Sequence, residues 1–414
     1  GTHLPDITVV TPWFENEARP LFYLASRAHH ADIGGITPGS MPAQSRNIDD
    51  EGVLIDNFFL VRAGNLQLDE TLALLTGARH PARNPAQNIA DLKAQLAANQ
   101  HGIRQLQKAI DRYGMQTVQN YLRFVRENAA TSVRRLLGGL RDGDFNYELD
   151  SGDRISVAIR VHREQATATI DFAGTSAQST TNFNAPEAVT RAAVLYVFRA
   201  MIREEIPMNE GCLEPLEIKI PRGSMLSPVA PAAVVAGNVE TSQCVTDAMF
   251  GALGALAASQ GTMNNLSFGN ERVQYYETIC GGAGAGPGFD GASAVHTHMT
   301  NSRMTDAEVL EQKFPVTVET FAIRPDSGGG GRWRGGNGAL RRLTFHEPVE
   351  ASILSNHRRV APFGVAGGRP AAVGINRVVR ADGSVTVLAG TASLQLEAGD
   401  SLVIETPGGG GFGD

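Results

Sequence analysis

Three side chains near the start of the chain have the types and the spacing of a metal site. His3 and Asp6 are separated by two residues, and His29 follows after two predicted strands. Two neutral imidazoles and one carboxylate suit Zn, Mn or Fe and leave coordination positions open for water and substrate. A metal held there would lower the pKa of bound water and polarise a carbonyl. The neighbouring His30 and Asp32 are alternative ligands, and histidines with a purely structural role are the other interpretation.

Two short apolar runs are expected to position these candidate ligands. Residues 7–14 and 21–26 flank the polar segment 15–20, which is the pattern of a β-hairpin with a polar turn. In an antiparallel pair, the start of the first strand lies beside the end of the second. All three candidate ligands are therefore placed at one end of the hairpin. Another strand is expected at 53–61.

The composition argues against several classes of protein. With 414 residues, 42% of them hydrophobic and 19% charged, the chain can hold two or three domains with substantial cores, and disorder is not expected. A net charge of -7 without a long basic run argues against nucleic-acid binding, and no apolar run reaches the length of a membrane span. Cys212, Cys244 and Cys280 are odd in number and widely spaced, which indicates reduced thiols in a cytoplasmic protein.

Residues 67–140 have the periodicity of two helices, which we interpret as a helical hairpin. Apolar residues recur at intervals of three, four or seven over 89–110, and a second such pattern covers 121–137 after a break at Gly114. Polar residues spaced four apart run beside the first apolar face: Asp91, Gln95 and Asn99. This stripe is either a solvated face or the lining of a polar cavity.

The remaining sequence alternates between strand and helix patterns and then becomes mostly β. Strands are expected within 145–173 and at 216–220, and helices at 186–203 and 237–258. The expected C-terminal strands are 272–279, 316–324, 338–345, 351–354, 378–387 and 401–404. We predict an α+β fold with mixed sheets, a long helical hairpin inserted after an N-terminal metal-binding hairpin, and a Gly-rich, mostly β C-terminal third. The predicted domains are 1–66, 67–140 and 141–414.

Three further stretches are dense in groups that could contact a substrate. The runs 260–265 and 296–301 are rich in Gln, Asn, Thr and His, and a His-x-His pair on a strand would point both rings to one face. We interpret His296 and His298 as residues of a pocket wall. The helix start at 237–242 is either an anion site, formed by free backbone N–H groups, or an ordinary cap.

Glycine occurs in clusters, where the backbone must bend sharply or approach a ligand. The run 281–288 has the letters of a dinucleotide fingerprint, but it does not open a helix, so the nucleotide interpretation is weak. The run 328–336 could cradle an anion with its backbone and two guanidinium groups, and it lacks the Gly-Lys-Ser/Thr of a P-loop. The run 408–411 is either a packed turn or a loose tail.

Seven strings of residues, taken together and in this order, resemble the hydantoinase B/5-oxoprolinase family. They are His3-Leu-Pro-Asp6, His29-His-Ala-Asp-Ile-Gly-Gly35, Gly39-Ser-Met-Pro42, Gly237-Asn-Val-Glu-Thr-Ser242, Gln260-Gly-Thr-Met-Asn-Asn265, Ala294-Val-His-Thr-His-Met-Thr-Asn301 and Ser327-Gly-Gly-Gly-Gly-Arg-Trp-Arg-Gly-Gly336. The resemblance covers essentially the whole chain. That family includes N-methylhydantoinase, 5-oxoprolinase and caprolactamase, with acetone and acetophenone carboxylase subunits as relatives.

The resemblance implies a division of labour between two subunits or fused halves. A hydantoinase A-type partner would bind ATP and phosphorylate the amide or carbonyl oxygen, and the B-type half would complete the chemistry at a divalent metal. The family's metal motif falls on His3, Asp6 and His29, with His30 still an alternative to His29. Family members carry about a further hundred residues before this motif, on the usual domain scale, and these are expected to supply another carboxylate ligand. We therefore expect the chain to be the later part of a longer polypeptide.

The function that the resemblance implies is ATP-dependent hydrolysis of a cyclic amide, such as a hydantoin, 5-oxoproline or a related lactam, within a cytoplasmic hetero-oligomer. The candidate catalytic residues are Asn264, His296 and His298. The candidate substrate-binding residues are Glu240, Thr241, Ser242, Gln260, Asn265 and Asn301. The alternatives are a subunit of an ATP-dependent ketone carboxylase and a non-catalytic scaffold for the ATP-binding partner.

Overall fold

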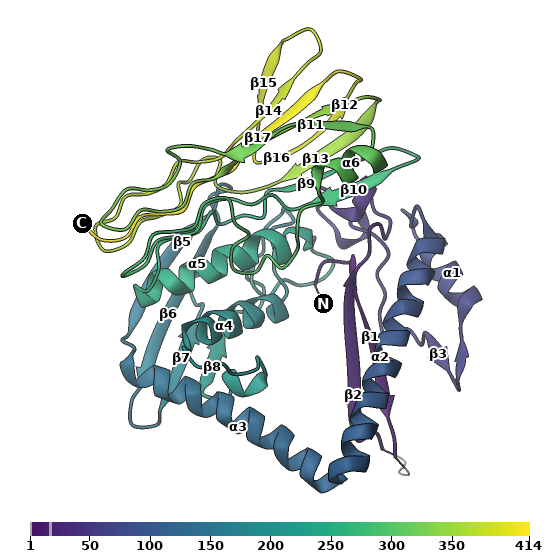
Figure 1. Cartoon of the computed structure of the whole chain (residues 1–414), viewed down its shortest axis with the longest axis vertical. Coiled ribbons are helices and arrows are strands. Elements are labelled where there is room, and N and C mark those ends of the chain that lie inside the picture. The colour runs from purple at the N-terminus through teal and green to yellow at the C-terminus, as the bar shows by residue number, and fades with distance from the viewer. Residues whose placement is uncertain (1, 16–18) are drawn as a thin grey trace.

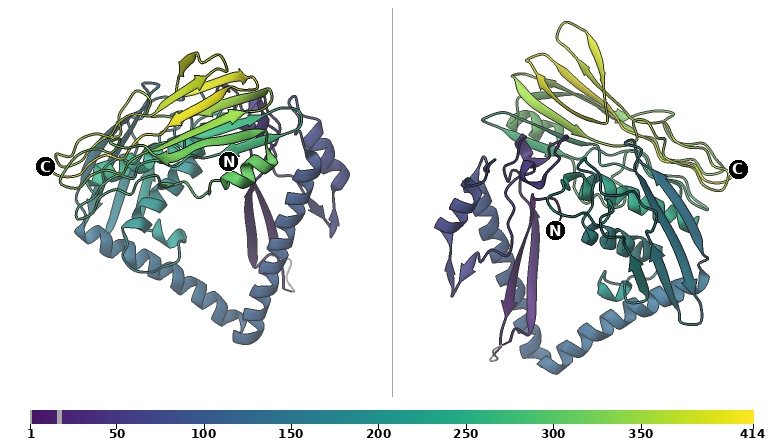
Figure 2. Two further views of the ribbon diagram at one scale, coloured as in Figure 1. Left: turned by 45° about the horizontal axis from the view of Figure 1, so that its top comes forward. Right: turned by 180° about the vertical axis from the view of Figure 1, so that it is seen from behind.

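The computed structural model describes residues 2–15 and 19–414 and has a mixed α+β architecture with several small sheets (Figures 1 and 2). The α-helices of these residues are α1 (Leu68–Thr76), α2 (Pro85–Tyr113), α3 (Met115–Gly139), α4 (Glu187–Met201), α5 (Ser242–Leu253) and α6 (Ala307–Lys313). None of the helices in the described part of the chain is long and apolar enough to cross a membrane. The three cysteines are buried free thiols.

The N-terminal hairpin forms as the two apolar runs predicted. β1 (Asp6–Trp13) pairs antiparallel with β2 (Phe22–His29), and the register places Asp6 opposite His29. The middle of the expected turn, residues 16–18, lies outside the described residues. Along β1 the residues alternate in burial, with Ile7 and Val9 in a core that also contains residues of α1 and α2. Because side chains alternate between the two faces of a strand, Asp6 lies on the face opposite this core.

The polar stripe of α2 attaches this helix to the hairpin. Gln95 and Asn99 are buried, and their side-chain amides donate to backbone carbonyls of β1. Gln95 Nε2 lies 2.9 Å from the oxygen of Ile7, and Asn99 Nδ2 lies 3.0 Å from the oxygen of Val9. For these two residues, both interpretations of the stripe, a solvated face and a cavity lining, are wrong.

The two long helices do not form a hairpin. They meet at Gly114, whose φ is +81°, and diverge as the arms of an open V in all three views (Figures 1 and 2). The prediction of two helices broken at this glycine is confirmed. The prediction that the two helices form a hairpin is wrong. The physical reason is that each helix has its own partner: Leu92 of α2 packs in the core of the hairpin, whereas Val133 and Leu137 of α3 pack in the central core.

The central body is a four-stranded sheet covered by helices. Its strands, in spatial order, are β5 (Gly143–Glu148), β6 (Arg154–His162), β7 (Thr167–Asp171) and β8 (Leu216–Lys219). Only β7 and β8 are parallel. Helices α4 and α5 pack on this sheet and share its apolar core. Helix α5 ends at Leu253 rather than near Ala258, because Gly254 adopts a left-handed conformation that caps it.

The C-terminal part is β-rich, as predicted, and consists of two sheets that enclose one core. The first sheet, in spatial order, contains β10 (Gln274–Glu277), β9 (Asn265–Gly269), β13 (Val349–Leu354) and β16 (Thr391–Leu396). The second contains β11 (Val316–Ile323), β12 (Ala339–Phe345), β17 (Ser401–Glu405), β14 (Ile375–Val379) and β15 (Val385–Leu388). Strands β9 and β16 were not predicted. The strand expected at 53–61 is wrong, since only the short pair β3 (Val61–Arg62) and β4 (Asn65–Leu66) forms there.

The glycine runs pack against one another, backbone to backbone. The N–H of Gly409 donates to the oxygen of Gly336 (2.8 Å), and the N–H of Gly329 donates to the oxygen of Gly409 (2.8 Å). A Cβ on Gly335 would lie 1.8 Å from the oxygen of Gly409, so any larger residue would push the segments apart. The run 408–411 is therefore a packed segment. The run 281–288 leads directly into irregular structure rather than into a helix, which argues against the dinucleotide interpretation.

Candidate metal centre

The structure brings His3, Asp6 and His29 together at one end of the hairpin. His29 Nδ1 lies 3.1 Å from Asp6 Oδ1 and 3.3 Å from His3 Nε2, and His3 Nε2 lies 3.7 Å from Asp6 Oδ1. One ligand atom from each residue thus lies within 4.8 Å of the other two. Atoms that each bind one ion at about 2.1 Å are separated by at most twice that length, so these three separations fit a shared divalent cation.

Electrostatics favour the protonation states that bind a metal. Burial lowers the pKa of His3 to about 4, with His29 adding to this effect and Asp6 opposing it. Burial alone would raise the pKa of Asp6, but the hydrogen bond with His29 and the two nearby imidazoles hold it below its usual value. A neutral imidazole and a carboxylate are the forms that ligate metals. The three candidate ligand atoms lie close together, and a bound cation would stabilise such an arrangement.

The alternative ligands His30 and Asp32 are engaged in structural contacts. His30 is fully buried, and its Nε2 lies 3.2 Å from Gln95 Oε1. Asp32 is buried and forms an ion pair of 2.9 Å with Arg83. The geometry therefore favours His29 over both as the third ligand of the candidate site.

Two residues that sequence reasoning missed hold the candidate ligands in place. Asn238 Nδ2 donates to Asp6 Oδ2 (3.2 Å), which leaves Oδ1 facing the imidazoles. The ring of Tyr276, on β10, stacks on His29 with a centroid separation of 5.2 Å and an interplanar angle of 24°. The Tyr276 hydroxyl donates to Asn265 Oδ1 (2.7 Å). Asn238 belongs to one of the seven strings quoted above, whereas nothing in the local sequence distinguishes Tyr276.

The predicted helix start at 237–242 is neither an open anion site nor an ordinary cap. Gly237–Thr241 form a buried π-helical turn that leads into α5. The hydroxyl of Thr241 donates to the oxygen of Phe183 (2.6 Å), and the hydroxyl of Ser242 donates to the oxygen of Asn238 (2.5 Å). Both side chains therefore bond to backbone, and the turn serves to place Asn238 beside the candidate ligands.

Four of the predicted catalytic or substrate-binding residues lie in a buried polar network. Glu240 is fully buried, and its Oε1 accepts hydrogen bonds from Asn265 Nδ2 (2.7 Å) and Thr262 Oγ1 (2.9 Å). Gln260 Oε1 accepts from Asn264 Nδ2 (2.7 Å). The bond between Asn265 and Tyr276 described above connects this network to the candidate metal centre.

His296 and His298 do not lie on a strand. The prediction that a strand points both rings to one face is therefore wrong. The segment is irregular, and His298 has a φ of +47°. His298 Nδ1 lies 3.2 Å from the Tyr196 hydroxyl, and its Nε2 lies 3.2 Å from Asp247 Oδ1. His296 is half-buried, and burial lowers its pKa. Asn301 is exposed on the same loop.

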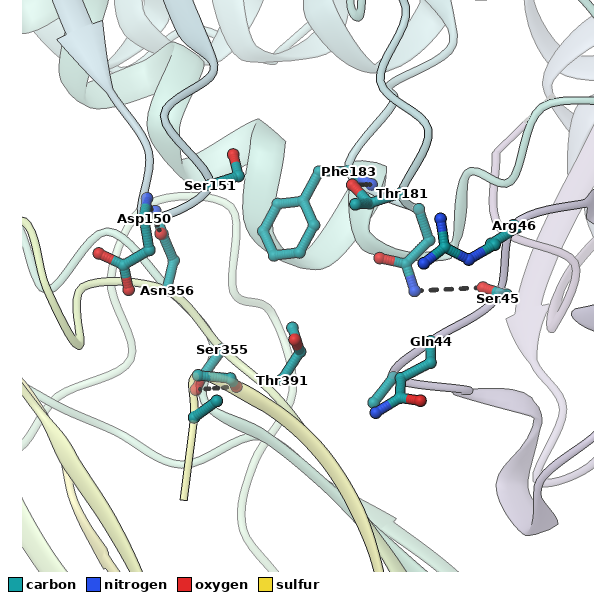
Figure 3. Close-up of a pocket in the computed structure, with 14 residues that line it drawn as sticks. Gln44, Ser45, Arg46, Asp150, Ser151, Thr181, Phe183, Ser355, Asn356 and Thr391 are labelled. Atoms are coloured by element: carbon teal, nitrogen blue, oxygen red, sulfur yellow. Dashed lines mark hydrogen bonds between the residues drawn. The ribbon is translucent and has the colours of Figure 1, made fainter. Parts of the chain in front are cut away.

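Two cavities are relevant to binding, and only one adjoins the candidate ligands. A cavity of about 460 Å³ is lined by His3, Asp6, Thr8 and Arg27 together with mostly apolar residues. A cavity of about 520 Å³ lies elsewhere, and its lining includes Arg46, Asp150 and Phe183 (Figure 3). None of the predicted catalytic and substrate-binding residues lines either of these two cavities. Their roles stay predictions.

Glu240 is expected to make the stability of the fold depend on pH. Burial raises its pKa to about 8, although hydrogen bonds from Thr262, Met263 and Asn265 oppose the shift. The native state then keeps a proton that the unfolded chain releases near 4.5, so this contribution to stability is lost as the pH rises from 4.5 to about 8. We expect Glu240→Gln to flatten the pH dependence of the unfolding free energy by at most about 1.4 kcal/mol per pH unit.

Urea unfolding of both proteins across this pH window measures the effect. The matched control is Glu148→Gln, because Glu148 is exposed and its replacement should leave the slope as it is. An unchanged slope in Glu240→Gln would contradict the assignment of a retained proton to this carboxyl group.

The sequence of this chain is similar to a known protein family and to characterised relatives. The model of the family described as Hydantoinase B/oxoprolinase matches residues 1–414. The chain is 45% identical to 5-oxoprolinase 1 of Arabidopsis thaliana, with all of this chain aligned to 34% of that protein. It therefore spans about a third of the length of this relative.

Two solved structures share the fold. The crystal structure of the ATP-dependent caprolactamase from Pseudomonas jessenii superimposes with a TM-score of 0.86 at 23% identity, over all of this chain and 75% of that one. The nucleotide-free structure of acetone carboxylase, an enzyme of ATP-dependent acetone carboxylation, superimposes with a TM-score of 0.87 at 16% identity, over all of this chain and 63% of that one.

Proposed function

Because the chain belongs to the hydantoinase B/oxoprolinase family, we propose that it is the metal-containing B-type part of an ATP-dependent amidohydrolase. Its substrate is a cyclic amide, namely 5-oxoproline, a hydantoin or a related lactam. An A-type partner binds ATP and phosphorylates the amide oxygen, and this chain completes the hydrolysis. The name of the Arabidopsis relative, a 5-oxoprolinase, supports this reaction class.

The observation that carries the proposal is the convergence of His3, Asp6 and His29 beside a cavity of about 460 Å³. A divalent metal bound by these residues would activate water for attack on the former carbonyl carbon of the phosphorylated amide, from which phosphate then leaves. The cavity has the size of sites that bind small molecules. Its mostly apolar wall, which includes Ile55 and Val234, would pack against ring methylenes and exclude bulk water.

The residues around the candidate centre fix the orientation of its ligands. Asn238 holds one oxygen of Asp6, so the other oxygen is presented to the imidazoles. Tyr276 holds the plane of the His29 ring, and the bond to Asn265 in turn holds Tyr276. Such supporting contacts position metal ligands and commonly change metal affinity or activity by 10- to 100-fold, as an order of magnitude, when they are removed.

The proposed function is tested with the full chain and its ATP-binding partner. We expect ATP-dependent ring opening of 5-oxoproline, hydantoin or caprolactam, together with a bound divalent metal measured by elemental analysis. Removal of the metal by a chelator should stop ring opening without stopping partner binding, and addition of Zn, Mn or Fe should restore it.

Two outcomes would contradict the proposal. Incorporation of labelled bicarbonate into a ketone, without a ring-opened product, would make the protein a carboxylase subunit. Tight binding to the partner, with no bound metal and no catalysis, would make it a scaffold.

A further inference from the structure

Arg27 lies next to the candidate metal centre on the same face of the hairpin. The register pairs Thr8 with Arg27, two residues along from the pair of Asp6 and His29. Because side chains two apart on a strand share a face, all four point to the same side of the sheet. The two pairs are separated by about 7 Å along the strands, which is the rise of two residues.

The guanidinium group is oriented but has no acidic partner. Arg27 Nε donates to Thr8 Oγ1 (2.8 Å), which fixes one edge of the group. Within the described residues, no carboxylate forms an ion pair with Arg27, and its two terminal nitrogens form no hydrogen bond with the protein. An arginine anchored at Nε keeps its terminal N–H groups free for an incoming oxyanion, which it binds with two parallel hydrogen bonds.

Arg27 is also the only cationic side chain, histidine aside, among the residues that line the cavity of about 460 Å³. The other charged lining residue is Asp6, which the candidate metal centre uses. With a neutral substrate, the nearest counter-charge for the guanidinium is Asp6, a candidate metal ligand with which Arg27 forms no ion pair. A substrate with a carboxylate would match the guanidinium.

We propose that Arg27 determines specificity by binding the carboxylate of the cyclic amide, so that the substrate class is a lactam with an acidic substituent beside the ring nitrogen. This inference rests on the proposed function. In 5-oxoproline, only the ring nitrogen separates the amide carbon from the ring carbon that bears the carboxylate. The carboxylate can therefore reach Arg27 while the amide carbon faces the candidate metal centre.

The same chemistry could serve a phosphoryl group transferred from ATP, because a phosphate is also an oxyanion that arginine binds in this manner. The two sources differ in one respect. A phosphoryl group is present on every activated substrate, whereas the carboxylate is present only on acidic ones. A comparison of 5-oxoproline with 2-pyrrolidinone, which has the same ring without the carboxylate, distinguishes them.

The experiment measures kcat and KM of the complete enzyme, with its ATP-binding partner, for both compounds. Loss of a charge-assisted bidentate contact costs roughly 1.5–3 kcal/mol, so Arg27→Gln should raise the KM for 5-oxoproline by about 10- to 100-fold. The kcat/KM for 2-pyrrolidinone should stay within about threefold, since that ligand makes no such contact. Thr8→Val should give a smaller rise in the KM for 5-oxoproline, because it loosens the guanidinium and keeps its charge.

Arg134→Gln is the matched control, because Arg134 is an exposed arginine on α3 that lines neither cavity. It should change neither KM. If Arg27→Gln lowers kcat/KM by the same factor for both compounds, the carboxylate assignment is overturned and binding of the phosphoryl group is favoured. An unchanged KM for 5-oxoproline would overturn it outright.

Calorimetric binding of 5-oxoproline without ATP separates a failure of this inference from a failure of the proposed function. Binding that depends on Arg27, in an enzyme that does not open the ring, would contradict only the proposed function. Ring opening by the unmodified enzyme, with binding that does not depend on Arg27, would contradict only this inference.

Discussion

His3→Ala is expected to remove the bound metal and to lower ATP-dependent ring opening by more than roughly 100-fold, which exceeds the usual effect of losing only a supporting contact. His3 is a buried imidazole whose Nε2 faces both other candidate ligands. Alanine removes one of three donors and leaves Asp6 and His29, which together are too few for a tight divalent site. Elemental analysis of the purified enzyme and an assay of ring opening with the partner present measure the two effects.

The control for this variant is His101→Ala, which removes an exposed histidine on α2 that contacts Gln105. It should keep full metal content and activity. Unfolding curves of both variants establish whether His3→Ala is folded. A folded His3→Ala protein with unchanged metal content and activity would refute the assignment of His3 as a ligand.

Arg341→Leu is expected to destabilise the fold by about 3–5 kcal/mol, the usual cost of leaving one charge of a buried pair without its partner. Arg341 on β12 and Glu277 on β10 are both buried, and they connect the two C-terminal sheets. Arg341 Nε donates to Glu277 Oε1 (2.7 Å), and Nη2 donates to Oε2 (3.0 Å). Denaturant unfolding, monitored by circular dichroism, measures the loss.

This pair also connects the C-terminal sheets to the candidate metal centre. Glu277 follows Tyr276, the residue that stacks on His29, so a loosened β10 should also weaken metal binding. The double variant Arg341→Leu with Glu277→Leu should recover much of the stability, because no buried charge then remains unpaired.

The control for the ion pair is Arg160→Leu. Arg160 and Asp144 form an exposed pair, for which the expected loss is about 1 kcal/mol or less. A loss in Arg341→Leu no larger than in this control would contradict the role given to the buried pair.

The sequence by itself determined the N-terminal hairpin and the group of candidate ligands. Two short apolar runs on either side of a polar segment specify β1 and β2, and their antiparallel pairing places Asp6 opposite His29 without any distant contact. Helices α2 and α3, with the break at Gly114, follow from local periodicity for the same reason. These features depend on residues close in the chain, and local pattern is what a single sequence encodes directly.

Only the tertiary structure decided which polar residues serve structure and which face the candidate site. Gln95 has the pattern of a solvated stripe, yet it bonds to β1, because the backbone of the hairpin offers it acceptors. Glu240 is one of the predicted binding residues, yet it is buried away from both cavities.

Asn238 and Tyr276 contact the candidate ligands from segments far along the chain. The terminal nitrogens of Arg27 are free because no carboxylate of the described residues packs beside them. Such contacts depend on how separate elements pack, and a residue's type and its near neighbours carry no record of that packing.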